Sequence, residues 1–249
     1  MKDNFSTQAN VYAQYRPGYP KELIDYILGF VKEKDLAWDC GTGNGQSALH
    51  LSDHFKKVFA TDISQKQLDK AAAKENIIYA PEPAEKTSLA DRTADLITVA
   101  QAIHWFKFDA FYAEANRVAK PGAVIAVWTY SLLKISGEID KIINEYHFST
   151  LEKYWDPERK YVDDGYATIP FPFAEIKTNP FTIEVNWSLK DLEGYLNTWS
   201  ALQKFIVANS YSPVKDVIEK IRPRWGDGEK RKMIFPVHLR LGIIEKAAV

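Results

Sequence analysis

The sequence is poor in cysteine, in net charge and in long hydrophobic runs, and each absence excludes a class of protein. Its single cysteine, Cys40, can form neither an internal disulfide nor a cysteine cage for a metal ion. The 32 basic and 33 acidic side chains leave a formal net charge of −1, so no overall charge draws the chain to nucleic acid or membrane. No apolar stretch is long enough to span a bilayer, and residues 1–10 lack the apolar core of a signal peptide. We therefore expect a cytoplasmic protein with neither nucleic acid nor membrane as its partner, and with no bound metal.

The composition is that of an ordinary globular protein with an excess of aromatic residues. Of the 249 residues, 46% are hydrophobic and 26% are charged, which suits one large α/β domain with a sizeable core. Aromatic residues make up 13% of the chain and include seven tryptophans. Many of them lie from Trp128 onward, which makes the second half a candidate for an aromatic-lined site.

Short apolar segments alternate with amphipathic segments through the first half of the chain. Strands are expected over 36–40, 58–61, 77–79, 95–100 and 123–129. Helices are expected over 20–32, 46–57, 64–74 and 108–119, the third of them beginning at a capping box of Ser64 and Gln67. This alternation predicts an α/β fold, a Rossmann-like doubly wound sheet with right-handed crossovers.

The pattern changes after Tyr130. Helices and loops rich in aromatics are expected as a cap insertion over 131–172, followed by β-like runs within 173–187 and helices over 189–207 and 213–222. A final antiparallel strand is expected over 233–244, at an edge or bulged because of Pro236. The whole chain is then a single domain with about seven strands. Its parts are an N-terminal lid and helix (1–34), a cofactor-binding half (35–130), the cap (131–172), and C-terminal strands and helices (173–249).

A glycine-rich loop follows the strand that ends at Cys40. Gly41, Gly43 and Gly45 allow a tight turn and close approach of a ligand, at the strand ends where doubly wound sheets bind their ligands. A dinucleotide-binding loop would have glycine in place of Gln46, and a phosphate-binding loop would have lysine before Ser47. The loop therefore fits neither pyrophosphate nor triphosphate.

Two acidic residues flank this loop. Asp39 precedes it and could face a positively charged or amino-bearing ligand. Asp62 ends the second strand, where a carboxylate could accept hydrogen bonds from both ribose hydroxyls. Alternatively, Asp62 merely precedes the next helix. The location of the loop at these strand ends argues for a nucleotide-like ligand.

The run DCGTGNG over residues 39–45 resembles motif I of class I S-adenosylmethionine-dependent methyltransferases, and Asp62 resembles their ribose-binding acid. Three further runs resemble the methyltransferase type 11 branch that acts on small molecules and is similar to trans-aconitate methyltransferase. They are YAQYRPGYP at 12–20, AQAIHWF at 100–106 and RVAKPGA at 117–123. The resemblance covers residues 5 to 130 well and implies S-adenosyl-L-methionine as cofactor, with S-adenosyl-L-homocysteine as its product.

The resemblance also implies which residues bind the cofactor. The loop backbone, Asp39 and Gln101 would meet its methionine part, and Asp62 with Ile63 its ribose and adenine. Arg16 could pair with the cofactor carboxylate or belong to a surface loop. Pro83 replaces the aspartate that binds adenine in many members, which shifts that contact to Ala84, Glu85 or a neighbour. The predicted cofactor set is Tyr15, Arg16, Asp39, Gly41, Gly43, Asn44, Asp62, Ile63, Ala84, Glu85 and Gln101.

Methyl transfer from a sulfonium is an in-line displacement, so the protein mainly positions the reactants and excludes water. His104 would border the transfer site, either as a general base or as a structural histidine. The acceptor is expected to be a small molecule. Aromatic side chains would line its site or else fill the core of a cap: Tyr19, Trp105, Trp128, Tyr130, Trp155 and Trp199.

Four other interpretations deserve weight. Tyr211 and Lys215 match the Tyr-x-x-x-Lys pair of short-chain dehydrogenases, which would make the chain an NAD(P)-dependent oxidoreductase, although the glycine spacing disfavours it. His50 and His54 have zinc-protease spacing, but Leu51 replaces the catalytic glutamate. Basic residues over 215–232 could bind nucleic acid, yet acidic residues are interleaved with them. A non-catalytic cofactor-binding protein stays open, because methyl transfer requires no obligatory catalytic side chain.

Overall fold

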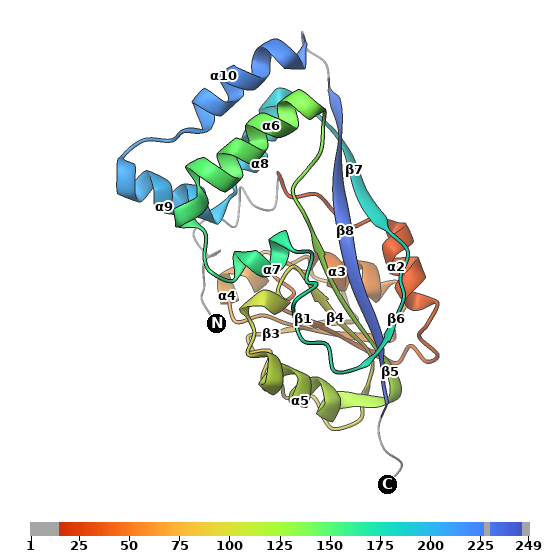
Figure 1. Cartoon of the computed structure of the whole chain (residues 1–249). Coiled ribbons are helices and arrows are strands. Elements are labelled where there is room, and N and C mark those ends of the chain that lie inside the picture. The colour runs from red at the N-terminus through yellow and green to blue at the C-terminus, as the bar shows by residue number, and fades with distance from the viewer. Residues whose placement is uncertain (1–14, 227–229, 246–249) are drawn as a thin grey trace.

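A mixed eight-stranded sheet forms the centre of the computed structural model, which describes residues 15–226 and 230–245 (Figure 1). The strand order is β3-β2-β1-β4-β5-β8-β6, and β7 pairs with β8. The strands are β1 (Leu36–Cys40), β2 (Lys57–Thr61), β3 (Ile77–Ala80), β4 (Ala94–Ala100), β5 (Ala119–Tyr130), β6 (Ala174–Ile176), β7 (Phe181–Trp187) and β8 (Arg231–Ile244). Residues 1–14, which belong to the predicted N-terminal lid and helix, lie outside the described residues.

Strands β1 to β5 pair in parallel, and helices cover both faces, so the predicted doubly wound fold is confirmed. The helices of this half are α2 (Lys21–Leu28), α3 (Gln46–Ser52), α4 (Gln65–Leu68) and α5 (Phe108–Val118), with the 3-10 turn η1 (Ile103–Trp105). Apolar side chains of α2 and α3 pack in one core, and those of α5 in a second core on the other face. β4 is buried from Ala94 to Val99, as its near-continuous apolar sequence predicts.

Helix α4 differs from its prediction. It ends at Leu68, not near residue 74, and the Ser64 side chain caps no backbone N–H. The backbone N–H of Ser64 instead donates to Oδ1 of Asp62 at 2.8 Å. This local side-chain bond of Asp62 holds the backbone at the start of the helix, in place of the predicted capping box.

Strand β8 runs antiparallel to β5, which confirms the predicted final strand. Residues 173–187 form two strands, β6 and β7, so the sheet has eight strands where about seven were expected. Pro236 is inside β8, and β8 lies between β5 and β7, so the edge position expected for this proline was wrong. The β5–β8 ladder ends at the pair Tyr130–Val237, next to Pro236. A proline has no N–H to donate, and at this position the ladder with β5 does not require one.

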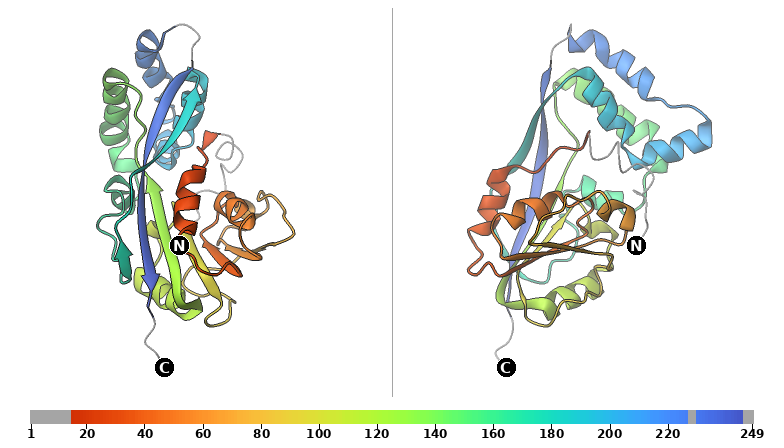
Figure 2. Two further views of the ribbon diagram at one scale, coloured as in Figure 1. Left: turned by 90° about the vertical axis from the view of Figure 1, so that its right-hand side faces the viewer. Right: turned by 180° about the vertical axis from the view of Figure 1, so that it is seen from behind.

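A helical cap stands along β7 and the first half of β8 (Figures 1 and 2). Its elements are α6 (Gly137–Glu145), the π-helical turn η2 (Tyr146–Thr150), η3 (Glu152–Tyr154), α7 (Arg159–Asp163), α8 (Leu189–Asn197), α9 (Ser200–Asn209) and α10 (Val214–Trp225). α6 contacts α10, and α10 contacts α8. Helices that precede β6 and β7 in the chain and helices that follow them therefore share this layer. None of the helices in the described part of the chain has the length and apolar character that crossing a membrane requires.

Candidate active site

A cavity lies at the carboxyl ends of β1, β2 and β4, beneath residues 16–19. Its empty space is about 920 Å³, a value that includes solvent at the open mouth. Its wall is formed by Arg16, Pro17, Tyr19, Gly41, Thr42, Gly43, Asn44, Gln46, Ser47, Asp62, Ile63, Ser64, Gln67, Ala100, Gln101, Ala102, Trp105, Phe106 and Tyr130. Seven predicted cofactor residues are therefore brought together: Arg16, Gly41, Gly43, Asn44, Asp62, Ile63 and Gln101.

The glycine loop has the left-handed backbone that its sequence indicates. Gly41, Gly43 and Gly45 have φ values of 69°, 57° and 82°. A Cβ on Gly41 would lie 2.6 Å from Cβ of Ala102, whereas a Cβ on Gly43 would meet no atom within 4 Å. Packing against the loop that contains Ala102 therefore requires a glycine at position 41, whereas Gly43 leaves open space beside the cavity.

Asp62 ties the glycine loop to the end of β2. Its Oδ2 accepts a hydrogen bond from the Gly43 N–H at 2.9 Å, and its Oδ1 accepts the bond from Ser64. The N–H groups of Gly41 and Thr42 both donate to the Thr61 carbonyl, at 2.8 and 2.9 Å. The carboxylate thus stands in the cavity wall with its orientation set by backbone donors.

Asp39 does not line the cavity, although its sequence position suggested that it would face a ligand. It is fully buried, and its carboxylate accepts hydrogen bonds from Oγ1 of Thr42 at 2.5 Å and from Oγ1 of Thr98 at 2.7 Å. Burial raises the pKa of Asp39 to about 6, because desolvation outweighs these two bonds. Asp39 therefore stabilises the glycine loop by connecting Thr42 of the loop to Thr98 of β4.

Three other predicted cofactor residues also lie outside the cavity wall. Ala84 is buried in the core on the α5 face, and Glu85 accepts a hydrogen bond from the Lys107 N–H at 3.0 Å. Tyr15 packs on the cap, because a Cβ on Gly194 of α8 would come within 2.5 Å of its ring. Ser64 and Gln67 line the cavity beside Asp62 and Ile63, although the sequence analysis considered these two residues only as a capping box.

A second cavity adjoins the first under the cap. Four residues line both cavities: Arg16, Gln101, Trp105 and Tyr130. The rest of its wall comes from His104, Ser131, Trp155, Asp156, Arg159, Val162, Tyr195 and Ser200. The two cavities therefore meet at one junction, which combines the N-terminal segment, the end of β4 and the end of β5.

Two junction residues are held in place by bonds to neighbouring elements. Arg16 donates from Nη1 to the Tyr130 hydroxyl at 2.9 Å, and its guanidinium lies 5.3 Å from the ring centre of Tyr195. Gln101 has a left-handed backbone with φ 55°. Its Oε1 accepts a hydrogen bond from Oγ1 of Thr129 at 2.6 Å. A non-glycine residue in this conformation is strained, and such strain is common at functional sites.

His104 lines the second cavity as a buried, neutral side chain. Its Nδ1 is hydrogen-bonded to the Tyr166 hydroxyl at 2.7 Å. Burial, together with the charge of Arg159, lowers the pKa of His104 to about 3. A general base works best when its pKa is near the working pH, so this environment argues against the base role considered for His104.

The predicted acceptor residues divide into cavity wall and core. Trp105, Tyr130 and Trp155 line the second cavity, and Tyr19 lines the first. Trp128 and Trp199 line neither, because both are buried in the core shared by the sheet and the cap. Trp128 packs edge-on against Tyr19 with ring centres 5.4 Å apart, and Trp199 stacks on Tyr146 at 5.4 Å.

Several residues of the second cavity were not predicted from the sequence. Arg159, Asp156 and Ser200 come from loops and helix ends of the cap, where no local motif marks them. The one available signal was a charged residue within the aromatic-rich segment YWDPERKY, which spans 154–161. Charged residues are so common on solvated surfaces that this signal alone could not have identified Arg159.

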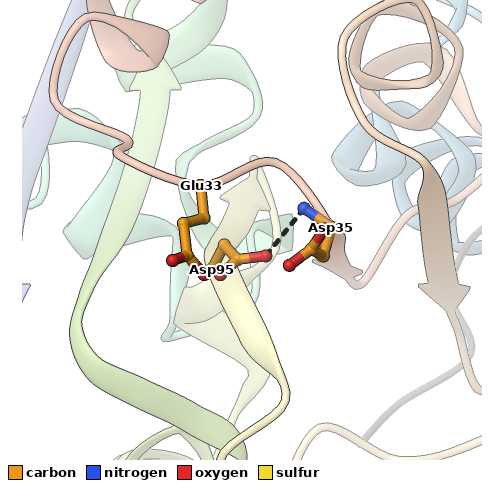
Figure 3. A group of neighbouring side chains, drawn as sticks. All are labelled: Glu33, Asp35 and Asp95. Atoms are coloured by element: carbon orange, nitrogen blue, oxygen red, sulfur yellow. Dashed lines mark hydrogen bonds between the residues drawn. The ribbon is translucent and has the colours of Figure 1, made fainter.

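A cluster of three acidic side chains lies at the opposite, amino-terminal edge of the sheet (Figure 3). Glu33, Asp35 and Asp95 have ligand atoms within 4.8 Å of one another. Nζ of Lys120 lies 3.0 Å from Glu33, 3.1 Å from Asp35 and 2.6 Å from Asp95. The ammonium group of Lys120 therefore already pairs with all three carboxylates.

Comparison with known proteins agrees with the geometry. The model of a methyltransferase domain matches residues 38–127. The chain is 35% identical over 247 residues to a candidate methyltransferase of Dictyostelium discoideum, covering 96% of this chain and 94% of that protein. A solved structure of a candidate type II methyltransferase from Anaeromyxobacter dehalogenans has 36% identity and a TM-score of 0.87, covering 94% of this chain and 100% of that one. Phosphoethanolamine N-methyltransferase 2 of Haemonchus contortus, solved with S-adenosyl-L-methionine, shares the fold at 14% identity and a TM-score of 0.50, over 97% of this chain and 57% of that one.

Proposed function

The chain belongs to the class I S-adenosylmethionine-dependent methyltransferases, and from this premise we propose that it methylates a small molecule bound in the second cavity. The observation that carries the proposal is the junction of Arg16, Gln101, Trp105 and Tyr130, where the two cavities meet. A cofactor in the first cavity and an acceptor in the second would meet there. The cap above the second cavity suits a small acceptor better than a nucleic acid.

The wall of the first cavity suits the chemical groups of S-adenosylmethionine. Asp62 offers carboxylate oxygens for ribose hydroxyls, and Arg16 offers a guanidinium for the methionine carboxylate. Oγ of Ser47 is buried, lines the cavity and makes no hydrogen bond within the part of the chain that is described, so a bound ligand could supply its partner. Among the residues that the structure describes, Arg16 is the one cationic side chain in this wall, which suits a single carboxylate and not the pyrophosphate of NAD(P).

The proposed role of the protein in the transfer is positioning. When bound, S-adenosylmethionine would supply a methyl group on a sulfonium sulfur. The sulfur would keep the electron pair of the sulfur–carbon bond, and the acceptor atom would supply the pair for its new bond to the methyl carbon. The junction residues hold the acceptor atom in line with that carbon and exclude water. A carboxylate acceptor has no proton to lose, and a hydroxyl or amine would release its proton to water, since His104 is a weak base.

The competing oxidoreductase interpretation finds no support in the cavity walls. Tyr211 is 54% exposed, and neither Tyr211 nor Lys215 lines either cavity. We further propose a reducing, cytoplasmic setting, because the single cysteine of the chain, Cys40, is a buried free thiol.

The test is calorimetric titration with S-adenosylmethionine and, separately, with NAD. We expect S-adenosylmethionine to bind and NAD not to bind. Asp62→Ala should weaken S-adenosylmethionine binding at least about tenfold, because the ribose loses a charged acceptor. Asp69→Ala, at an exposed carboxylate directly after helix α4, is the matched control and should bind normally. Tighter binding of NAD, or equal effects of the two variants, would refute the proposal. Release of S-adenosylhomocysteine with any small acceptor would exclude a non-catalytic protein.

A further inference from the structure

We propose that Arg159 selects the acceptor, by binding a carboxylate that is separate from the atom receiving the methyl group. This inference rests on the proposed function of the two cavities. It predicts a bifunctional acceptor, which is a small acid with a carboxylate at one end and a nucleophilic atom at the other.

The position of Arg159 separates the two ends of such an acceptor. Arg16, Gln101, Trp105 and Tyr130 line both cavities, so the methyl group must pass among them. Arg159 lines the second cavity and does not line the first. A group that pairs with Arg159 therefore lies away from the junction, deeper under the cap.

The guanidinium of Arg159 is held in one orientation by two neighbours. Its Nε donates to Oδ1 of Asp163 at 2.8 Å, and its Cζ lies 4.6 Å from the ring centre of Trp155. Its side chain is 24% exposed, so it retains access to the cavity. Anchoring by Nε and by the ring reduces the conformational entropy that binding would otherwise cost.

The outer nitrogens of Arg159 are available to a ligand. Neither Nη1 nor Nη2 donates a hydrogen bond to any residue that the structure describes. A guanidinium with both outer donors available matches the two oxygens of one carboxylate in a bidentate pair. This pairing is stronger and more directional than that of an ammonium group.

The charged side chains around the second cavity favour a ligand group that carries a single negative charge. Among the described residues, the charged side chains of its wall are Arg16, Asp156 and Arg159, and Lys204 neutralises Asp156 at 2.7 Å. Because the proposed function assigns Arg16 to the carboxylate of the cofactor and buried His104 is neutral, Arg159 is the positive charge of this wall that an acceptor can meet. A carboxylate balances this charge, whereas a phosphate dianion would leave a buried negative charge unpaired.

The remaining wall suits the body of an organic acid. Trp105, Trp155 and Tyr195 present rings to the second cavity. Apolar and planar surfaces of a ligand bury well against such rings. The second cavity thus combines an apolar wall, a cation under the cap and the transfer junction.

The experiment compares small hydroxy, amino and aromatic acids with their primary amides. Binding to the protein loaded with S-adenosylhomocysteine is measured by calorimetry, and transfer by release of S-adenosylhomocysteine. We expect at least one acid to be preferred over its amide by about tenfold or more, because the amide leaves Arg159 without an anion. Arg159→Gln should remove the preference through KM, and Arg159→Lys should keep part of it.

The control is Arg222→Gln, on the exposed face of α10, which should change neither preference nor affinity. S-adenosylhomocysteine affinity should stay within about twofold in every variant, since Arg159 is outside the first cavity. Equal binding of acids and amides by the native protein, an equal effect of Arg159→Gln on both, or a preference for phosphate monoesters would overturn the inference. So would the absence of any binding acid. Methylation of neutral acceptors would leave the proposed function intact, whereas failure to bind the cofactor would refute that function itself.

Discussion

The parallel half of the sheet and the helical cap build their cavities in different ways. In the parallel half, four consecutive loop residues, Gly41 to Asn44, line the cavity together with Asp62, whose carboxylate accepts a hydrogen bond from the Gly43 N–H. In the cap, the wall comes from side chains on separate elements, such as Trp155, Arg159 and Tyr195. A site built from backbone is readable as a local motif, and a site built from scattered side chains is not.

The comparison also concerns what the aromatic residues do. The excess of tryptophan suggested an aromatic acceptor site, but the cap uses its rings both for the cavity wall and for its own core. Trp155 belongs to the wall, and Trp199 belongs to the core that the cap shares with the sheet. Substitutions in each region can therefore test whether the division between binding and packing is correct.

The largest effect is expected in the core of the cap. Trp199→Ala should lower the free energy of unfolding by about 3–5 kcal/mol, because it removes a fully packed indole. Trp155→Ala, at a half-buried wall position, is the control and should cost less stability while raising the acceptor KM. Urea unfolding and steady-state kinetics measure the two effects. If Trp199→Ala kept native stability and lost acceptor binding, Trp199 would belong to the site after all.

The next largest effect is expected in the glycine loop. Gly41→Ala should lower the free energy of unfolding by about 2–4 kcal/mol, from left-handed strain and a clash with Ala102. Gly43→Ala has the same strain with no clash, so we expect about 1–2 kcal/mol. Urea unfolding compares them. Equal losses would show that packing between the two loops does not require Gly41.

A pH-dependent effect is expected from Asp39, beneath the same loop. Its pKa is raised to about 6 in the folded protein. Between pH 4 and 6 the folded state therefore retains a proton that the unfolded state has released, and the free energy of unfolding falls as pH rises. Asp39→Asn should remove this contribution, which is up to about 3 kcal/mol.

The measurement for Asp39 is the difference in unfolding free energy between the native protein and Asp39→Asn at pH 4 and pH 7. Taking the difference cancels His104 and His147, whose pKa values are both lowered by burial to about 3. The two histidines change the free energy of unfolding with pH in the opposite direction to Asp39, because their contribution to stability is lost as pH falls below about 6.5. A difference that does not change with pH would mean that Asp39 is ionised normally.

The smallest effect is expected at His104. Because its pKa is about 3, kcat should show no inflection near pH 6.5. His104→Gln should lower kcat less than about tenfold, since the loss is one hydrogen bond to Tyr166 and not a base. A rate profile from pH 5 to 8 tests both points. An inflection that disappears in the variant would restore the general-base role.

The sequence allowed the sheet to be predicted closely, because each parallel strand is short, apolar and bounded by turn residues. The expected strand 36–40 coincides with β1, and the others differ at their ends by a few residues. Helix α4 was overestimated, because Asp62 binds the backbone of Ser64 and the capping pattern is not used. Strand β6 and strand β7 could not be separated within 173–187 by periodicity alone.

The candidate site was predictable where contact with a ligand depends on backbone shape. Gly41, Gly43 and Asp62 were assigned to a cavity wall that the structure contains. Tyr15, Asp39, Ala84 and Glu85 were assigned to it as well, but each side chain is engaged elsewhere. Their direction depends on burial and on partners that are distant in the chain, such as Thr98 for Asp39.

What the sequence by itself determined is the fold class, the glycine loop and the class of cofactor, because these depend on local periodicity and on neighbouring residues. What only the tertiary structure decided is the second cavity, which we propose as the acceptor site. Arg16, Tyr130 and Arg159 lie far apart in the chain, yet the parallel sheet and the cap place them around one space. The physical reason is that long-range packing sets which side chains face a cavity, and no local pattern of hydrophobicity or charge records that choice.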